Sequence, residues 1–270
     1  LALLAQAFAV EVVAYTVMSN HFHLVLRLAP EKTKAWTPDE VIERWSMIYG
    51  IPHLIEAASC PGAPTEVVDA ARELVEIRRE RLGDLSWFMK CLVEPIARMA
   101  NREDGCTGAF WEGRFKSQAL LDEKALLACM AYVDLNPIRA EISESLHDSG
   151  YTSVQQRIRG EDTVPLVPFQ DQSADLDTLP LKLYDYLMLV EWTGRVVLPG
   201  KRGWISQSSP SILRTLGFED HAWAASMKLF KNAELQALGP LSAIRELARR
   251  LSRHWFRGQG ECQGALGLDA

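Results

Sequence analysis

The hydrophobic pattern at the start of the chain predicts a short helix followed by a β-hairpin. Residues 1–9 are apolar except Gln6, and this run is much shorter than the roughly 20 residues that a membrane span needs. We therefore expect a buried helix there. Residues 10–28 are rich in Val, Tyr, Thr, Phe and Leu, and Ser19 and Asn20 in their middle are candidates for a turn. This pattern predicts two paired strands.

The second arm of the hairpin is predicted to have two faces of different chemistry. Strand side chains alternate between the faces of a sheet, so every second residue points the same way. His21 and His23 therefore project together from one face. The even-numbered positions are apolar and predict the core face: Phe22, Leu24, Leu26 and Leu28. Two imidazoles side by side are how a metal or phosphate site would be built.

The pattern changes to helices after the hairpin. Thr37 and Glu40 have the spacing of a capping box at the start of a helix. Further helices are predicted over residues 64–82 and 86–101, and residues 33–84 are interpreted as a helical insertion. The charges of the 64–82 helix are mixed in sign, which favours a solvated face over a nucleic-acid patch. They are Glu73, Glu76, Arg78, Arg79, Glu80 and Arg81.

A strand with one basic face is predicted over residues 110–120. Its alternation places Arg114, Lys116 and Gln118 on the same side. A basic strand face can hold phosphate groups. The alternative is a solvated edge strand, because lysine on an edge also protects a sheet against aggregation.

The helix that follows places a tyrosine away from its apolar side. Asp122 is the expected N-cap, and the apolar residues after it recur with the helical period. Tyr132 lies off that apolar sector among small residues, and Asn136 follows it by one helical turn. A catalytic role and the ordinary packing of a half-buried tyrosine are both open from periodicity alone.

Composition and charge narrow the class of protein. The chain has 270 residues, of which 48% are hydrophobic and 24% charged, so disorder, collagen and coiled coil are excluded. Lys and Arg number 29 against 35 Asp and Glu, and the net charge of −6 does not suit nonspecific coating of duplex DNA. Any nucleic-acid site must therefore be local. Five cysteines without a Cys-x-x-Cys pair indicate neither a disulfide framework nor structural zinc, so a reducing cytoplasm is expected.

The last part of the chain is predicted to be a linker followed by helices. Residues 163–180 are polar and contain proline, as in a linker or wrapping segment. Helices are predicted over residues 181–192, 209–216 and 243–257. The last of these has the densest positive charge of the chain, from Arg245, Arg249, Arg250, Arg253 and Arg257. Both DNA contact and a solvated face are consistent with that helix.

Three segments resemble, in this order, the signature stretches of the single-tyrosine HUH transposases, in particular the REP-associated (RAYT-like) branch. Residues 17–26 contain His-Phe-His, and residues 110–117 read Phe-Trp-Glu-Gly-Arg-Phe-Lys-Ser. Residues 132–140 begin with the tyrosine and contain Asn-Pro-Ile-Arg. A lone His-x-His is weak evidence, but the ordered trio is specific. The resemblance covers about residues 1–160, with the insertion set aside.

The resemblance implies an α+β fold. A ferredoxin-like antiparallel sheet would carry the histidines on a central strand, with helices packed on its other side. Residues 1–162 would form the catalytic domain with its helical insertion, and residues 163–270 a linker and a small helical domain. Relatives begin with a further strand, whereas this chain starts inside the first helix. A sheet without that strand has an unpaired edge, so we expect either an incomplete reading of the gene or a decayed copy.

The resemblance also implies a role for each candidate residue. His21 and His23 match the pair that holds one divalent cation, Mg²⁺ or Mn²⁺, and Asn136 matches the residue that completes the metal site. Tyr132 matches the nucleophile. DNA contacts are expected from basic residues, namely Arg114, Lys116, Arg139, Arg249, Arg250 and Arg253.

These roles imply an enzyme that cuts and rejoins single-stranded or hairpin DNA. The tyrosine hydroxyl would attack the scissile phosphate and leave a 5′-phosphotyrosine and a free 3′-OH. One alternative is a domesticated or decayed derivative that binds DNA without catalysis. Another is a metal-dependent phosphohydrolase that uses the histidines without a covalent step. No membrane partner is expected, and the sequence leaves monomer and homodimer equally open.

Overall fold

The computed structural model describes residues 1–173, 177–197, 213, 220–230, 235–254 and 256. The chain combines helices and strands, in agreement with the broad α+β expectation, and it divides into two compact units. Unit 1 comprises Leu1–Val12, Leu26–Phe115 and Asp162–Pro165. Unit 2 comprises Val13–Val25, Lys116–Glu161 and Leu166–Ala270. Within the described residues, no helix has the length and apolar character that crossing a membrane requires.

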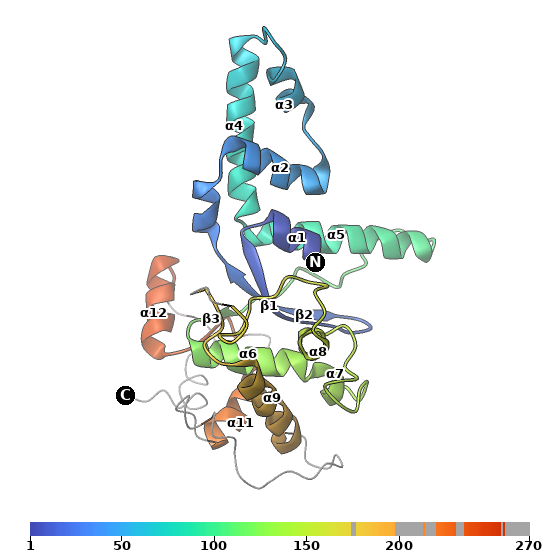
Figure 1. Ribbon diagram of the computed structural model, residues 1–270, viewed down its shortest axis with the longest axis vertical. Helices are drawn as coiled ribbons and strands as arrows, with labels where there is room; N and C mark the ends of the chain where they lie inside the picture. The colour runs from blue at the N-terminus through green and yellow to red at the C-terminus, as the bar shows by residue number, and fades with distance from the viewer. Residues whose placement is uncertain (174–176, 198–212, 214–219, 231–234, 255, 257–270) are drawn as a thin grey trace. The chain divides into compact units, whose positions relative to one another are not determined.

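Unit 1 is mostly helical and contains the predicted insertion. Helix α2 (Pro38–Tyr49) starts at the expected capping box, because the Thr37 hydroxyl accepts from the Glu40 amide and the Glu40 carboxylate accepts from the Thr37 amide. That prediction is confirmed. Helices α2 and α3 (His53–Ala58) both pack along α4 (Thr65–Leu82), as Figure 1 shows. The other helices of the unit are α1 (Ala2–Ala7), η1 (Pro30–Ala35) and α5 (Leu85–Glu103).

The predicted hairpin is present, and its strands contribute to both units. Strands β1 (Val10–Val17) and β2 (Phe22–Leu28) pair in a two-stranded antiparallel sheet. The chain reverses at Ser19 and Asn20, where the turn was expected. The Met18 amide closes the turn by donating to the His21 carbonyl at 2.8 Å.

The edge of β1 that faces away from β2 is partly covered within unit 2. Thr16 forms an antiparallel bridge with Thr152, and the Tyr15 amide donates to the Ser153 hydroxyl at 3.0 Å. The Val17 amide donates to the Tyr151 carbonyl at 3.0 Å. Backbone groups that an additional strand would pair thus have other partners at these positions.

A second sheet of two short strands lies in unit 2. Strands β3 (Ala119–Leu120) and β4 (Ala237–Leu238) pair in parallel, with Ala119 opposite Ala237. The strands of the described residues therefore form two separate two-stranded sheets. The single ferredoxin-like sheet implied by the resemblance stays a prediction.

The strand predicted over residues 110–120 is correct only for its last two residues. Residues 110–118 are irregular. The rings of Phe110 and Trp111 pack edge to face, 4.9 Å apart, and the Trp111 indole N–H donates to the Val93 carbonyl at 3.0 Å. Alternation of polar and apolar residues within one segment does not by itself supply the paired neighbouring backbone that a strand needs.

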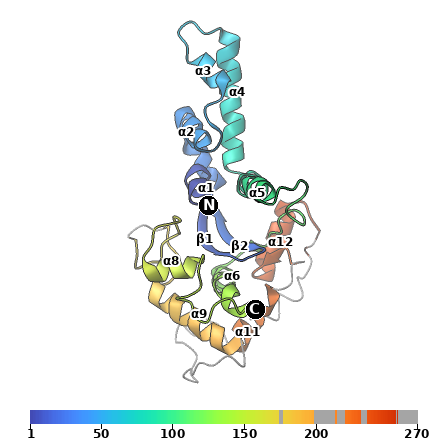
Figure 2. The same cartoon turned by 90° about the vertical axis from the view of Figure 1, so that its right-hand side faces the viewer.

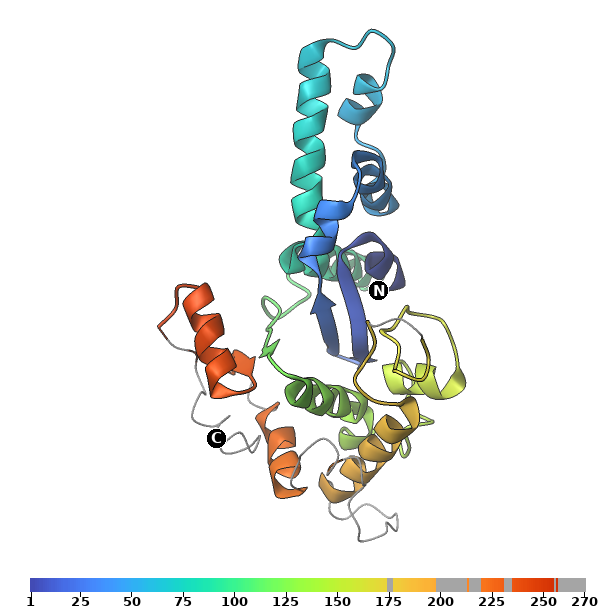
Figure 3. The same cartoon turned by 60° about the vertical axis from the view of Figure 1, so that its left-hand side comes forward.

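Helix α6 (Glu123–Asp134) lies at the centre of unit 2. It begins at the predicted N-cap, where the Asp122 carboxylate accepts from the Ala125 amide at 2.7 Å. Its apolar side is buried against α9 (Leu183–Val197) and α11 (Asp220–Leu229), and Figures 2 and 3 show these helices beside it. The remaining helices are α7 (Asn136–Arg139), α8 (Ser153–Arg159) and α12 (Leu241–Arg250). Of the predicted 209–216 helix, all but Leu213 lies outside the described residues.

For the part of β2 that belongs to unit 2, the prediction of which face is buried is wrong. Val25 lies on the histidine side by alternation, yet it is 2% exposed and belongs to the same core as α6. Phe22 and Leu24, on the expected core side, are only partly buried. The reason is that α6 covers the histidine side of the strand, which the pattern within the strand cannot show. His23 therefore lies beside this helix.

Candidate active site

The two histidines lie side by side at the start of β2. Their ring centroids are 5.1 Å apart and the ring planes meet at 85°. His21 Nδ1 is 2.7 Å from the Asn20 side-chain oxygen. Because a carbonyl oxygen can only accept, Nδ1 is the donor, and the Nε2 lone pair of His21 remains available to a cation. The sequence prediction that these imidazoles project together is confirmed.

Tyr132 lies against this histidine pair. It sits in the last turn of α6, and the edge of its ring meets the His23 ring at 80°, with centroids 5.8 Å apart. On another side the ring packs on Phe230, with centroids 5.4 Å apart. Two segments more than a hundred residues apart in the sequence thus bring the predicted nucleophile and the predicted cation ligands together.

Arg139 completes the cluster from α7. Its guanidinium carbon lies 4.6 Å from the centroid of the Tyr132 ring, close enough for a cation–π contact. Its Nη1 atom is buried and has no hydrogen-bond partner among the described residues. Buried donors are normally paired, so this nitrogen marks a position that suits an anion. Arg139 is predicted from the sequence to contact DNA, and the structure places it at the tyrosine.

The surroundings of His23 favour its neutral form. Burial, His21 and the Arg139 charge, in that order, lower the pKa of His23 from 6.5 to about 4. The imidazole is therefore neutral near pH 7. Neutral imidazole is the form that binds metal ions.

Asn136 follows the helix that carries the tyrosine. Its side-chain nitrogen donates to the Tyr132 carbonyl at 3.0 Å, which leaves the side-chain oxygen as the atom that could bind a cation. Two imidazoles and an amide oxygen fit part of the ligand set of a divalent cation, with water or phosphate oxygens to complete it. Among the described residues there is no group of three or more His, Cys, Asp or Glu residues that could hold a metal ion.

Two of the predicted DNA contacts lie in the irregular segment over residues 110–118. Arg114 and Lys116 are both exposed there. The prediction that they share the face of a strand is wrong, because residues 110–118 are irregular and β3 begins only at Ala119. Exposure alone neither supports nor excludes phosphate contact by these two side chains.

Helix α12 presents basic side chains to solvent. Arg249 and Arg250 are exposed, and Arg249 forms an ion pair with Glu246. Arg253 is also exposed, just beyond the end of the helix. Arg257, which the prediction placed in the same helix, lies outside the described residues. In the described part of unit 2, neither Lys116 nor these arginines have a ring contact, ion pair or hydrogen bond to Tyr132 or the histidines.

A buried network behind the tyrosine escaped the sequence analysis. Asp134, two residues after Tyr132, is fully buried. Its carboxylate accepts from the Ser153 hydroxyl at 2.6 Å, from the Val154 amide at 3.1 Å and from the Tyr186 hydroxyl. Burial raises the pKa of Asp134, and these hydrogen bonds oppose that shift. The network ties α6 to α8 and α9.

Arg157 links the same region to the hairpin. Its Nη2 atom donates to the Val13 and Val167 carbonyls, each at 3.0 Å, and its guanidinium lies over the ring of Phe169. Its charge also favours the ionised form of Asp134. The sequence signal for this network is Asp134, a charged residue directly after the uncharged run 125–133, which indicates a buried partner without identifying it.

No protein-family model, curated protein or solved structure matches this chain. Support for a function therefore comes from the sequence segments described above and from the contacts of residues in unit 2. The decisive contact is that of His23 with Tyr132, with Arg139 on the same tyrosine ring.

Proposed function

We propose that this protein is a transposase-type DNA strand transferase that cuts and rejoins single-stranded or hairpin DNA through Tyr132. The observation that carries the proposal is the contact of a two-histidine cluster with a tyrosine ring that also meets an arginine. Phosphoryl transfer needs an oxygen nucleophile in line with the leaving group and positive charge on the phosphate oxygens. The cluster supplies a candidate for each requirement. The resemblance of the three sequence segments supports the same reaction.

The proposed reaction has two steps of the same kind. The Tyr132 oxygen attacks the scissile phosphorus, the bond from phosphorus to the 3′-oxygen breaks, and the DNA 5′ end becomes a phosphotyrosine ester. The phenol proton passes to water, and the leaving 3′-oxygen takes a proton from water. In the second step a free 3′-OH attacks the phosphotyrosine, which restores the tyrosine and joins the strands. The ester conserves the energy of the broken bond, so rejoining needs no ATP.

His21, His23 and the side-chain oxygen of Asn136 would hold a divalent cation, Mg²⁺ or Mn²⁺. When bound, the cation would offset the charge that develops on the non-bridging phosphate oxygens. The neutral state of His23 keeps its lone pair available near pH 7. Because two of the three protein donors are nitrogen, Mn²⁺ suits this set better than Mg²⁺.

Arg139 is the residue that would bind the phosphate directly. Its Nη1, which has no hydrogen-bond partner in the part of the chain that the structure describes, can donate to a phosphate oxygen. A charge-assisted hydrogen bond of this kind is stronger than a neutral one. Its contact with the tyrosine ring also fixes the ring in place. Arg139 thus couples the position of the nucleophile to that of the phosphate.

The test is a search for a covalent protein–DNA adduct. The full chain is incubated with labelled single-stranded hairpin DNA and Mn²⁺, and the products are separated on a denaturing gel. We expect a labelled band at the mass of protein plus the 5′-phosphorylated DNA fragment, and we expect EDTA to abolish it. Binding without any adduct, across a panel of hairpins, would favour the non-catalytic DNA-binding derivative.

Replacing Asn136 tests the third ligand. For Asn136→Ala we expect the Mn²⁺ concentration for half-maximal adduct formation to rise by roughly tenfold, because an amide oxygen is a weak ligand that water can replace. Asn136→Asp is the matched variant, since it keeps a ligand oxygen but loses the amide donor to the Tyr132 carbonyl. Equal impairment of both variants would show that the hydrogen bond, and not a ligand oxygen, is what Asn136 contributes.

A further inference from the structure

Unit 1 contains an open pocket with aromatic and basic walls. Helices α2, α4 and α5 supply most of its lining, and its volume is about 340 Å³. We call it the aromatic–basic pocket. Its principal residues are Trp45, Tyr49, Arg78, Trp87 and Lys90. None of them belongs to the histidine–tyrosine cluster, which lies in unit 2.

Two stacked rings form a rigid platform in this pocket. Trp45 is 4% exposed, and its ring stacks on Tyr49 with centroids 4.8 Å apart and planes at 24°. Tyr49 is 49% exposed, so part of its ring faces the open side. The Tyr49 hydroxyl lies 3.2 Å from the Cys91 sulfur, which holds the ring in place. An exposed aromatic ring backed by a buried one is what a nucleobase needs for stacking.

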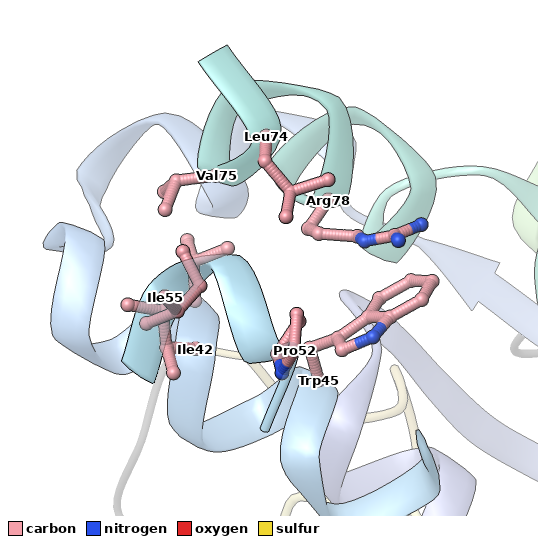
Figure 4. Close-up of a pocket in the computed structure, with 8 residues that line it drawn as sticks. Ile42, Trp45, Pro52, Ile55, Leu74, Val75 and Arg78 are labelled. Atoms are coloured by element: carbon pink, nitrogen blue, oxygen red, sulfur yellow. The ribbon is translucent and has the colours of Figure 1, made fainter. Parts of the chain in front are cut away.

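Three cations lie over the tryptophans. The guanidinium carbon of Arg78 is 4.0 Å from the centroid of Trp45, and Figure 4 shows it above the indole. Over Trp87 lie the Arg81 guanidinium carbon at 4.1 Å and the Lys90 amine at 4.7 Å. The rings hold these long side chains in place, so less conformational entropy is lost when an anion binds.

These three cations have no carboxylate partner within ion-pair distance among the described residues. Their neighbours do have partners, since Arg79 pairs with Glu76 and Arg98 with Glu94. The Asp84 carboxylate is engaged at the N-terminus of α5, where it accepts from a backbone amide at 2.8 Å. Arg78 and Lys90, which line the pocket, and Arg81, which adjoins it on Trp87, thus form no ion pair among the described residues, although the whole chain carries −6. On α4, Arg79 is ion-paired whereas Arg78 and Arg81 are not paired among the described residues. The sequence alone does not reveal this difference.

Arg78 also shows an unused donor. Its Nε atom is buried and has no hydrogen-bond partner among the described residues. On the far side of Arg78, Figure 4 shows Leu74 and Val75 of α4 facing Ile42 and Ile55, an apolar wall that cannot accept a hydrogen bond. A phosphate oxygen or an acceptor atom of a base that enters the pocket could accept a hydrogen bond from Arg78.

We propose that the aromatic–basic pocket binds single-stranded DNA at a second site, apart from the catalytic cluster. One base would stack on the Tyr49 ring, and neighbouring phosphates would meet Arg78, Arg81 and Lys90. A pocket of this volume is near the lower end of ligand sites and suits one unstacked nucleotide, which a duplex does not offer. The choice of DNA over RNA rests on the proposed function, whereas the stacked rings and the three cations suit either single-stranded nucleic acid.

The charge contacts are tested by salt dependence. Binding of a labelled oligo-dT to the full chain is followed by fluorescence anisotropy, in a Tyr132→Phe background that prevents covalent trapping. For the double variant Arg81→Gln, Lys90→Gln we expect weaker binding and a slope of log affinity against log salt reduced by about 1.4, from two lost phosphate contacts. The matched control is Arg72→Gln, Arg98→Gln, which makes the same charge change on the same two helices at ion-paired positions. Equal slopes for the two double variants would overturn the proposal.

The stacking contact is tested at Tyr49. For Tyr49→Ala we expect affinity for oligo-dT to fall by roughly 5- to 100-fold, the contribution of one stacked base. Tyr49→Phe keeps the ring and loses only the hydroxyl contact with Cys91, so it should bind like the parent protein. An abasic oligonucleotide should bind the parent weakly and should not distinguish Tyr49→Ala from Tyr49→Phe. If the abasic strand binds as tightly as oligo-dT, the pocket is a general polyanion site and the proposal fails.

The outcomes separate this site from the catalytic proposal. Adduct formation with hairpin DNA is measured for the pocket variants with Tyr132 intact. If the pocket variants form the adduct and bind the oligonucleotide with unaltered affinity, the second site is contradicted and the catalytic proposal is not. If the pocket variants bind the oligonucleotide more weakly but the wild-type protein forms no adduct, the second site is supported and only the catalytic proposal is contradicted. Tighter binding of oligo-U than of oligo-dT would overturn the assignment to DNA.

Discussion

A Tyr132→Phe variant should bind hairpin DNA as tightly as the wild-type protein and form no covalent adduct with it. The substitution removes only the attacking oxygen. The ring that remains can keep its contacts with His23, Arg139 and Phe230, so the shape of the cluster is preserved. We expect the adduct to be undetectable, a loss of roughly 10³-fold or more that is typical when a covalent nucleophile is removed. The measurement is the denaturing gel, with binding followed separately by anisotropy.

The control for this variant is another tyrosine of unit 2. Tyr151 is 80% exposed, and Tyr151→Phe should form the adduct at the wild-type rate. If the Tyr132→Phe protein still cuts hairpin DNA, the covalent mechanism is wrong. Cleavage without an adduct would then point to a phosphohydrolase that uses His21 and His23 alone.

Local sequence signals predicted the parts of the fold that depend on neighbouring residues. The caps at Thr37 and Asp122 are short-range hydrogen bonds, so the residues at the helix start are sufficient to specify them. The hairpin turn at Ser19 and Asn20 is local in the same sense. The pairing of the two imidazoles follows from strand alternation and needed no knowledge of the rest of the chain.

The parts that were missed depend on partners far away in the sequence. The prediction for β2 placed its apolar core opposite the histidines, but α6 packs on the histidine side and buries Val25. Residues 110–118 alternate like a strand and yet are irregular, because alternation does not supply a pairing partner. Phe230 reaches Tyr132 across almost a hundred residues, and no local pattern marks it.

The position of the nucleophile helix depends on the C-terminal part of the chain. Gly194 of α9 lies so close to α6 that an added Cβ would come within 2.9 Å of a Leu135 methyl group. Tyr186, on the same helix α9, reaches the Asp134 carboxylate two residues after Tyr132. The buried hydrogen bond from Tyr186 thus holds α9 against α6, and Gly194 leaves room for the Leu135 side chain between them. We infer that α9 is part of the framework that holds the candidate site in place.

The second large effect is expected from Asp134→Ala. The change leaves the Ser153 hydroxyl, the Val154 amide and the Tyr186 hydroxyl without their acceptor, all in a buried place. It also removes a nearby negative charge that favours the ionised form of the partly buried Arg157. Removing one member of a buried charged network costs about 3–5 kcal/mol of the free energy of unfolding. Asp148→Ala is the control, because the Asp148 side chain is 66% exposed and its removal should cost less than about 1 kcal/mol.

Hydrogen exchange can assign this loss to the right helices. Amide protection of α6, α8 and α9 should fall in Asp134→Ala, while the helices of unit 1 should keep theirs. Tyr186→Phe should reproduce a smaller part of the effect, about 1–3 kcal/mol, because it removes one donor and leaves the rest of the network in place. In that milder variant, adduct formation should slow while oligonucleotide affinity stays unchanged, since the nucleophile is displaced and the DNA contacts are not. Wild-type adduct rates in Tyr186→Phe, together with wild-type protection of α6 in Asp134→Ala, would show that the buried carboxylate does not position the tyrosine.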